Sequence, residues 1–213
     1  MADTASMSFA PELPFVYVGG DPSLDLVNTV DWTEAGMEMD RLADYARLTL
    51  WAEGAGIVGA GDGAELRREA RERRDEAEAA YREARRLRLA LHRLYAGVAT
   101  GTVREAALAD FNDMLGASMG RLALIGAGGA PGGGPLVRWT WRGAGDRLDA
   151  LLWPVVRAAA TLLVSDEGGR VRVCAGAGCG WVFVDRSRNG FRRWCQMEVC
   201  GTREKSRKRA SKR

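Results

Sequence analysis

Histidine is almost absent from this chain of 213 residues, in which His92 is the only one. Hydrolases, redox enzymes and metalloenzymes commonly use several histidines for proton transfer or metal binding, so this scarcity argues against an enzyme. His92 itself falls beside an apolar helical stripe, where a structural role is a simpler explanation than a catalytic one. We therefore expect no enzymatic activity and assign no catalytic residue.

Long apolar runs and export signals are also missing. No stretch approaches the roughly 18 uninterrupted apolar residues that a membrane-spanning helix requires. The first twenty residues contain Asp3 and Glu12 but neither a basic cluster nor an apolar core of signal-peptide length. With 46% hydrophobic and 28% charged residues, the composition is typical of a globular protein. We expect a cytoplasmic protein without a membrane partner.

Cysteine and lysine are absent from most of the chain and concentrated near its end. All four cysteines lie within residues 174–200, and the lysines lie at positions 205, 208 and 212. Residues 186–213 carry 11 basic and two acidic residues, a net charge of +9, whereas the other 185 residues carry 20 basic and 26 acidic residues, a net charge of −6. An acidic body with a basic end indicates two parts with different partners.

The body has the sequence pattern of a mainly helical domain. Apolar residues at three- and four-residue spacing predict helices over residues 22–28, 40–54, 64–99, 103–116 and 146–165. Asp21 and Asp40 are expected to cap the first two of these, and Pro154 is expected to kink the last. Short strands are expected at residues 15–18, and at residues 121–125 and 136–141, which would pair as a hairpin around a glycine-rich loop.

The cysteines form two close pairs with the spacing C-x4-C, fifteen residues, C-x4-C: Cys174, Cys179, Cys195 and Cys200. Two such pairs can bring four thiolates to one tetrahedral Zn²⁺, which would stabilise a segment too small to fold alone. Four cysteines leave no open coordination position, so the zinc would be structural. Two disulfides or an iron–sulfur cluster are the alternatives, although a reducing cytoplasm disfavours disulfides.

The residues around the cysteines predict a treble-clef-like order of knuckle, hairpin and helix. Strands are expected at residues 171–173 and 181–184, and the Asn189-Gly190 turn would return residues 191–194 antiparallel, ahead of a helix. Four aromatic residues of this segment could stack on bases, although most are expected to form its small core: Trp181, Phe183, Phe191 and Trp194.

The chain resembles a known protein family in two places. Residues 174–209, CAGAGCGWVFVDRSRNGFRRWCQMEVCGTREKSRKR, resemble the CGNR-type zinc finger, and residues 15–29, FVYVGGDPSLDLVNT, resemble the opening of the ABATE domain that accompanies it. The resemblance implies a bacterial, stress-associated transcription regulator. We therefore expect an α+β protein with an ABATE-like helical domain over residues 1–168 and a zinc finger with a basic tail over residues 169–213.

One position departs from the family pattern. Where the family has Cys-Gly-Asn-Arg, this chain has Cys200-Gly201-Thr202-Arg203. Thr202 offers a hydroxyl but loses the paired donor and acceptor of an asparagine amide, so the replacement leaves zinc binding untouched and weakens the case for base recognition at this position.

The basic residues of the finger are the expected nucleic-acid contacts: Arg186, Arg188, Arg192, Arg193, Arg203, Lys205, Arg207, Lys208 and Arg209. DNA is the expected partner, and the alternative is an RNA-binding or ribosome-associated protein, because phosphate contacts alone do not distinguish the two. The body could sense a small molecule, with Asp25 and Asn28 as candidate pocket residues one helical turn apart. Helix capping or buried hydrogen bonding would also explain these two residues.

Overall fold

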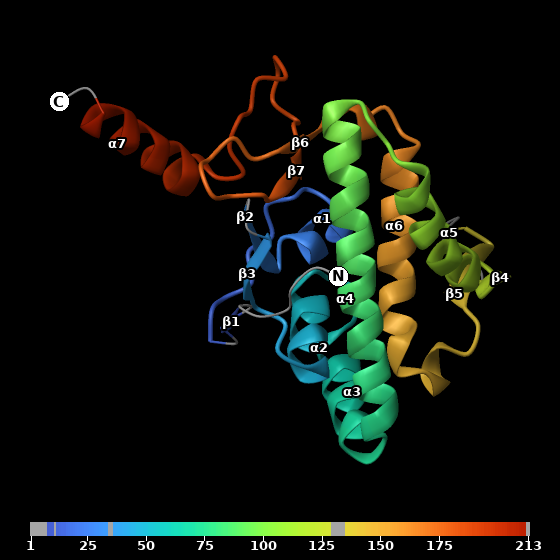
Figure 1. Ribbon diagram of the computed structural model, residues 1–213. Coiled ribbons are helices and arrows are strands. Elements are labelled where there is room, and N and C mark those ends of the chain that lie inside the picture. Colours follow the sequence, from blue (N-terminus) through green and yellow to red (C-terminus); the bar gives the residue numbers. More distant parts are fainter. Residues whose placement is uncertain (1–7, 11, 34–35, 129–134, 212–213) are drawn as a thin grey trace.

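The structure is a computed structural model that describes residues 8–10, 12–33, 36–128 and 135–211. A helical body is followed by a cysteine-rich segment, residues 171–211, which we call the finger (Figure 1). The α-helices are α1 (Pro22–Val27), α2 (Tyr45–Gly54), α3 (Ala60–Glu72), α4 (Arg74–Thr100), α5 (Glu105–Met119), α6 (Trp153–Leu163) and α7 (Thr202–Ala210). The strands are β1 (Ser8–Phe9), β2 (Val30–Thr33), β3 (Gly36–Asp40), β4 (Leu122–Gly126), β5 (Val137–Trp141), β6 (Val171–Val173) and β7 (Val182–Val184). Short helical turns are η1 (Ala144–Asp146), η2 (Leu148–Leu152), η3 (Gly168–Arg170) and η4 (Met197–Gly201).

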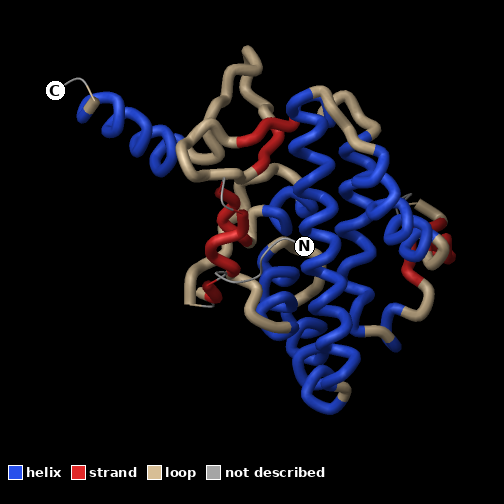
Figure 2. Tube along the Cα trace, in the orientation of Figure 1, coloured by secondary structure: helices blue, strands red, loops and turns tan. Residues whose placement is uncertain are grey.

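Helix α4 is the centre of the body. It runs the length of the body, with α1 and α2 on one side and α5 and α6 on the other, as Figure 2 also makes visible in the orientation of Figure 1. Its apolar residues recur at helical spacing and are buried, among them Leu87, Leu91, Leu94 and Tyr95. The mainly helical α+β class predicted from the sequence is confirmed.

The prediction of one long helix over residues 64–99 is wrong, because the chain breaks at Arg73. This residue leaves helical geometry, with φ −112° and ψ 55°, and separates α3 from α4. The break lets α3 fold back onto α2, where Arg67 pairs with Glu53 at 2.9 Å. A continuous helix would have carried the half-buried Leu66 beyond the core.

The helix expected over residues 40–54 begins only at Tyr45, because at Asp40 the chain still belongs to the hairpin of β2 and β3. Asp40 ends β3 and does not cap α2; the cap is Asp44, which accepts a hydrogen bond from the backbone N–H of Arg47 at 2.8 Å. Asp40 is instead buried with Arg88 of α4, and the two charged groups lie 2.5 Å apart. Such a pair is costly to bury and is retained only with close geometry. This bidentate contact provides that geometry.

Two further expectations need correction, and one is confirmed. Residues 15–18 form no strand and belong to no sheet. Pro154 lies in the first turn of α6, where proline is tolerated, so it starts the helix and does not kink it. The hairpin of β4 and β5 is confirmed, with Leu122 opposite Trp141, while the residues 129–134 of its glycine-rich loop lie outside the described part. Within the described ranges, no helix is both long enough and apolar enough to cross a bilayer.

Candidate metal centre and nucleic-acid interface

The four cysteine thiols converge on one point of the finger. Their sulfur atoms all lie within 4.8 Å of one another, with 3.8 Å between Cys179 and Cys195 and 3.7 Å between Cys195 and Cys200. A tetrahedral zinc with Zn–S bonds of about 2.3 Å sets neighbouring sulfurs about 3.8 Å apart. The cysteines are free and too far apart for disulfides. The finger therefore holds one structural zinc site, as the cysteine spacing predicted.

The first pair of cysteines sits on a knuckle that follows β6. Antiparallel β6 and β7 deliver Cys174, whose backbone N–H bonds to the carbonyl of Trp181 at 2.8 Å and so extends the ladder. The chain then turns tightly, with the N–H of Cys179 on the carbonyl of Gly176 at 3.0 Å. A Cβ at position 176 would lie 3.0 Å from the Cβ of Cys200, so glycine is needed where the knuckle meets the second pair.

The second pair is held against the first by backbone hydrogen bonds to sulfur. The N–H of Cys195 points at Cys174 Sγ at 3.3 Å, and that of Gly176 points at the same sulfur at 3.5 Å. Cys200 lies in η4, immediately before α7, so a metal bound there fixes the start of that helix. The expected order of knuckle and helix is confirmed.

The electrostatics of the thiols also fit a cation. Hydrogen bonds from the thiols of Cys179 and Cys195, together with backbone N–H groups, lower the pKa of Cys174 to about 2 and favour its thiolate. Donation of a hydrogen bond to Cys174 raises the pKa of Cys179 to about 12 and also raises that of Cys195, and repulsion by the neighbouring thiolate adds to both effects. A central divalent cation removes this repulsion and lets all four ionise.

The strand expected at residues 191–194 does not form. Only the carbonyl of Arg193 makes a ladder-like contact, accepting from the N–H of Ala175 at 2.8 Å. The side chain of Asp185 accepts a hydrogen bond from the N–H of Arg192 at 3.0 Å. The N–H of Arg192 is therefore not available to pair with β7. The returning segment is consequently held by side chains and by the cysteines.

The basic residues of α7 are all exposed: Arg203, Lys205, Arg207, Lys208 and Arg209. This helix extends from the metal site away from the body (Figure 1). Its sequence TREKSRKRA has no apolar stripe to bury, and Glu204 is its only buried residue. Glu204 pairs with Arg207 at 2.8 Å, while the side chain of Arg207 stays 66% exposed. Arg203 also lines a cavity of about 240 Å³ beside the cysteines.

Other basic residues of the finger make contacts inside the protein. Arg186 pairs with Glu167 at 2.6 Å and donates to the carbonyl of Gly20 at 2.9 Å. Arg192 lies 4.2 Å over the ring of Phe183 and donates to the carbonyls of Val18 and Cys195. These two arginines tie the finger to the body. Arg188 and Arg193 are exposed, and the guanidinium of Arg193 lies 5.4 Å from the ring of Trp194.

Asp25 and Asn28, the candidate pocket residues, serve as buried hydrogen-bonding groups. Asn28 pairs through both atoms of its amide with the N–H and carbonyl of Val182 in β7, each at 2.9 Å. Asp25 accepts from the N–H of Gly19 at 2.8 Å. Asn28 therefore joins α1 to the finger. No local pattern indicates this contact, because the partner of Asn28 lies 154 residues away and is a backbone group.

The contact region between the body and the finger contains further long-range contacts that the sequence patterns did not predict. Trp181 donates from its indole to the carbonyl of Val30 at 3.0 Å. His92 stacks on Trp32 with ring centres 3.7 Å apart and planes 4° from parallel. Burial lowers the pKa of His92 to about 4, against a hydrogen bond with the backbone of Gly180, so the ring is neutral at pH 7. His92 is thus a packed structural residue, as expected.

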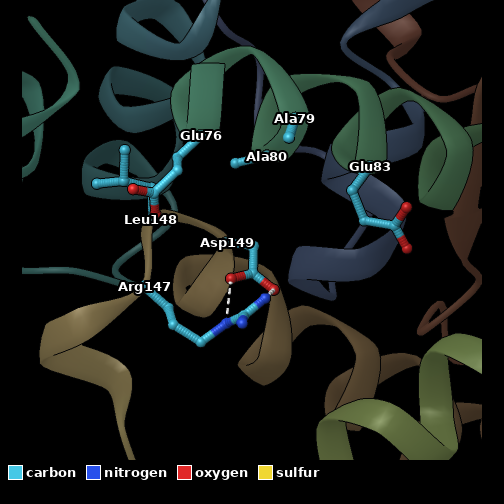
Figure 3. Close-up of a pocket in the computed structure, with 7 residues that line it drawn as sticks. All are labelled: Glu76, Ala79, Ala80, Glu83, Arg147, Leu148 and Asp149. Atoms are coloured by element: carbon cyan, nitrogen blue, oxygen red, sulfur yellow. Dashed lines mark hydrogen bonds and ion pairs between the residues drawn. The ribbon is translucent and has the colours of Figure 1, made fainter. Parts of the chain in front are cut away.

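A separate cavity of about 460 Å³ lies in the body between α4 and the segment before α6 (Figure 3). Glu76 and Glu83 come from α4, and Arg147 and Asp149 face them from the other wall, paired with each other at 2.8 Å. Ala79 and Ala80 lie on the α4 wall between the two glutamates. The hollow therefore lies at a different place from Asp25 and Asn28.

Thr202, which replaces the family asparagine, occupies the first position of α7. Its hydroxyl donates to the carbonyl of Met197 at 3.3 Å. The hydroxyl therefore bonds to the turn that carries Cys200, and its hydrogen is already committed within the finger.

Comparison with protein-family models gives two matches. Residues 20–166 match the ABATE model, described as "Putative stress-induced transcription regulator", and residues 170–213 match the CGNR zinc finger. The second match covers all four cysteines and α7. Among curated proteins, no sequence matches this chain.

Proposed function

The chain belongs to the ABATE family and carries a CGNR zinc finger, and on this premise we propose that it is a transcription regulator that binds DNA through its zinc-supported helix α7. The regulation is the stress-associated kind named in the family description. The proposal gives the body a structural and sensing role and assigns the protein no catalytic step.

The observation that carries the proposal is the isolation of α7. A helix of nine residues is unstable by itself in water, and this one has no apolar face to pack on the body. It is anchored at Cys200, which fixes its first turn, and its exposed surface carries five basic side chains. Such a helix is best explained as one whose partner is a polyanion outside the protein.

DNA is favoured over RNA by the dimensions of the helix. With its side chains, an α-helix such as α7 is about 10–12 Å across. The major groove of B-form DNA is about 12 Å wide and admits a helix, whereas the corresponding groove of A-form RNA is deep and too narrow for side chains to read. A short rigid basic helix therefore suits the DNA groove.

A salt series on three purified proteins tests the role of α7. In the first variant, Lys205→Gln, Lys208→Gln and Arg209→Gln remove three charges from α7 while keeping good helix formers. If these residues contact phosphates, the slope of log affinity against log salt for duplex DNA becomes shallower by about 2 to 3. The measurement is fluorescence anisotropy at several salt concentrations, with structured RNA as competitor.

The matched control removes three exposed charges from the body, through Arg71→Gln, Arg74→Gln and Arg82→Gln. This variant has the same net charge as the first but should keep the wild-type slope. Equal loss in both variants would mean that net charge alone governs binding and would reject α7 as the contact. Stronger competition by RNA than by DNA would favour the ribosome-associated alternative.

The sensing role belongs, in this proposal, to the cavity between α4 and the segment before α6 (Figure 3). Its volume of about 460 Å³ suits a small molecule, and three of its lining residues are acidic. Glu76 is paired with Arg73 and Asp149 with Arg147, whereas Glu83 meets Arg86 only at 3.5 Å, so Glu83 is the carboxylate most available to an amine. Primary amines and diamines should therefore raise the melting temperature of wild-type protein but not of Glu83→Gln, with Glu105→Gln as the exposed control. The absence of any shift with wild type would rule out this site.

A further inference from the structure

The loop between β7 and Cys195 is held by a buried carboxylate. Asp185 has no exposed surface, and its Oδ1 accepts from the backbone N–H and hydroxyl of Ser187 at 2.9 and 2.5 Å. Its other oxygen accepts from the N–H of Arg192 at 3.0 Å, which closes the loop. At the tip, Gly190 adopts a positive φ of 69°, and the N–H of Phe191 bonds to the Ser187 hydroxyl at 3.2 Å. The loop is therefore a braced structure.

This braced loop presents one large apolar side chain to solvent. Phe191 is 81% exposed, whereas Trp181 and Phe183 of the same finger are buried. Exposing a phenylalanine on a loop with fixed geometry contributes nothing to folding, because the ring gains no apolar contacts. The exposed ring is thus free to contact a partner.

The surroundings of Phe191 indicate the chemistry of that partner. Arg188, three residues earlier on the same tip, is exposed, and no ion pair is found for it in the described part of the chain. Arg193 follows on the other side and is also exposed. A single ring between cations is too little apolar area for a membrane or protein interface, but it matches a flat base flanked by phosphates.

The loop and α7 project from the same finger and away from the body (Figure 1). The loop is fixed to the cysteine cluster through Arg192 and Cys195, and α7 is fixed to it through Cys200. The same cysteine cluster therefore fixes the position of both elements.

We propose that Phe191 is a wedge that inserts between adjacent base pairs of the DNA bound by α7 and kinks the duplex there. The proposal rests on the DNA-binding function proposed above and adds a deformation of the DNA to it. Proteins that insert apolar side chains between base steps bend DNA in this way, and the neighbouring cations hold the flanking phosphates.

The test compares wild-type protein with Phe191→Ala on a duplex of about 30 base pairs, three helical turns, that carries 2-aminopurine and a pair of end dyes. Wild-type protein should raise 2-aminopurine fluorescence by unstacking and shorten the end-to-end distance. Phe191→Ala should lose both signals and bind about 5- to 150-fold more weakly, the range that corresponds to the loss of one stacked base. Its salt slope should remain that of wild type, because no phosphate contact is lost.

Two further variants separate the wedge from a general effect of lost apolar surface. Phe191→Trp should keep both signals. Leu136→Ala, which removes a 75% exposed apolar side chain from the body, should leave binding and bending unchanged. Zinc content and melting temperature are measured for each variant to confirm that the finger is folded.

The outcomes distinguish the wedge from DNA binding itself. Salt-sensitive binding by wild type with no difference in Phe191→Ala would overturn the wedge and leave the function of α7 standing. A loss in Phe191→Ala confined to binding of anionic lipid vesicles would also overturn it. Failure of wild-type protein to bind DNA would refute the proposed function, and the wedge with it.

Discussion

Asp25 is a carboxyl group held inside the body at the start of α1. Its side chain is only 8% exposed, and burial raises its pKa from an ordinary 3.8 to about 6, against the lowering effect of the hydrogen bond from Gly19. The negative charge of Asp21 raises it further. The folded protein therefore binds this proton more tightly than the unfolded chain does.

The sign of the pH dependence follows from that difference. As the pH rises from about 4 to about 6, Asp25 ionises at increasing cost in the folded state, and its contribution to the free energy of unfolding falls by up to about 3 kcal/mol. Asp25→Asn should therefore match wild type near pH 4 and exceed it in stability at pH 7. Denaturant unfolding across this range measures the difference, with the exposed Asp113→Asn as control. Parallel curves for Asp25→Asn and wild type would contradict the argument.

At the scale of elements, one half of the finger is held by the body and the other half by the cysteine cluster. Strand β7 is bound to the body, because the N–H of Val182 pairs with Asn28 and that of Val184 pairs with the carbonyl of Gly19 at 2.8 Å. Residues 181–184 are buried in the same apolar core as the helices of the body. The knuckle, η4 and α7 depend on the cysteine cluster instead.

Removal of the metal should therefore unfold only part of the finger. With zinc chelated, the amides of α7 and of residues 174–179 should exchange with solvent at rates typical of unfolded chain, because metal binding supplies the folding energy of such segments. The amides of Val182 and Val184 should remain protected. Hydrogen exchange followed by mass spectrometry measures both regions in one sample, and rapid exchange at β7 would show that the whole finger is one zinc-dependent unit.

Sequence patterns predicted the elements that depend on local periodicity or on fixed spacing. The apolar face of α4, the hairpin of β4 and β5, and the cysteine cluster belong to this kind. The predictions fail where a residue far away in the sequence determines the local structure. Asp40 satisfies the rules for a helix cap, yet Arg88, 48 residues away, draws it into a buried ion pair. Asn28 and Arg192 likewise bond to backbone groups that no local pattern reveals.

At the scale of the whole molecule, charge is divided between the two parts. The residues before position 186 carry a net charge of −6 and those from 186 onward carry +9. The acidic body is repelled by a nucleic-acid surface, whereas the finger is attracted to it. Long-range electrostatic forces therefore orient the molecule with the finger toward that surface before contact. In the proposed DNA binding, this orientation increases the fraction of encounters in which α7 and the loop meet the duplex.

Because α7 buries almost nothing, its surface is free to change over evolutionary time. Substitutions at exposed positions away from caps and cores usually alter stability by less than about 0.5 kcal/mol. The zinc cluster fixes where the helix begins, while Lys205, Lys208 and Arg209 contribute little to folding. Under the proposed function, a lineage could thus exchange these side chains and acquire new target genes while inheriting the scaffold intact.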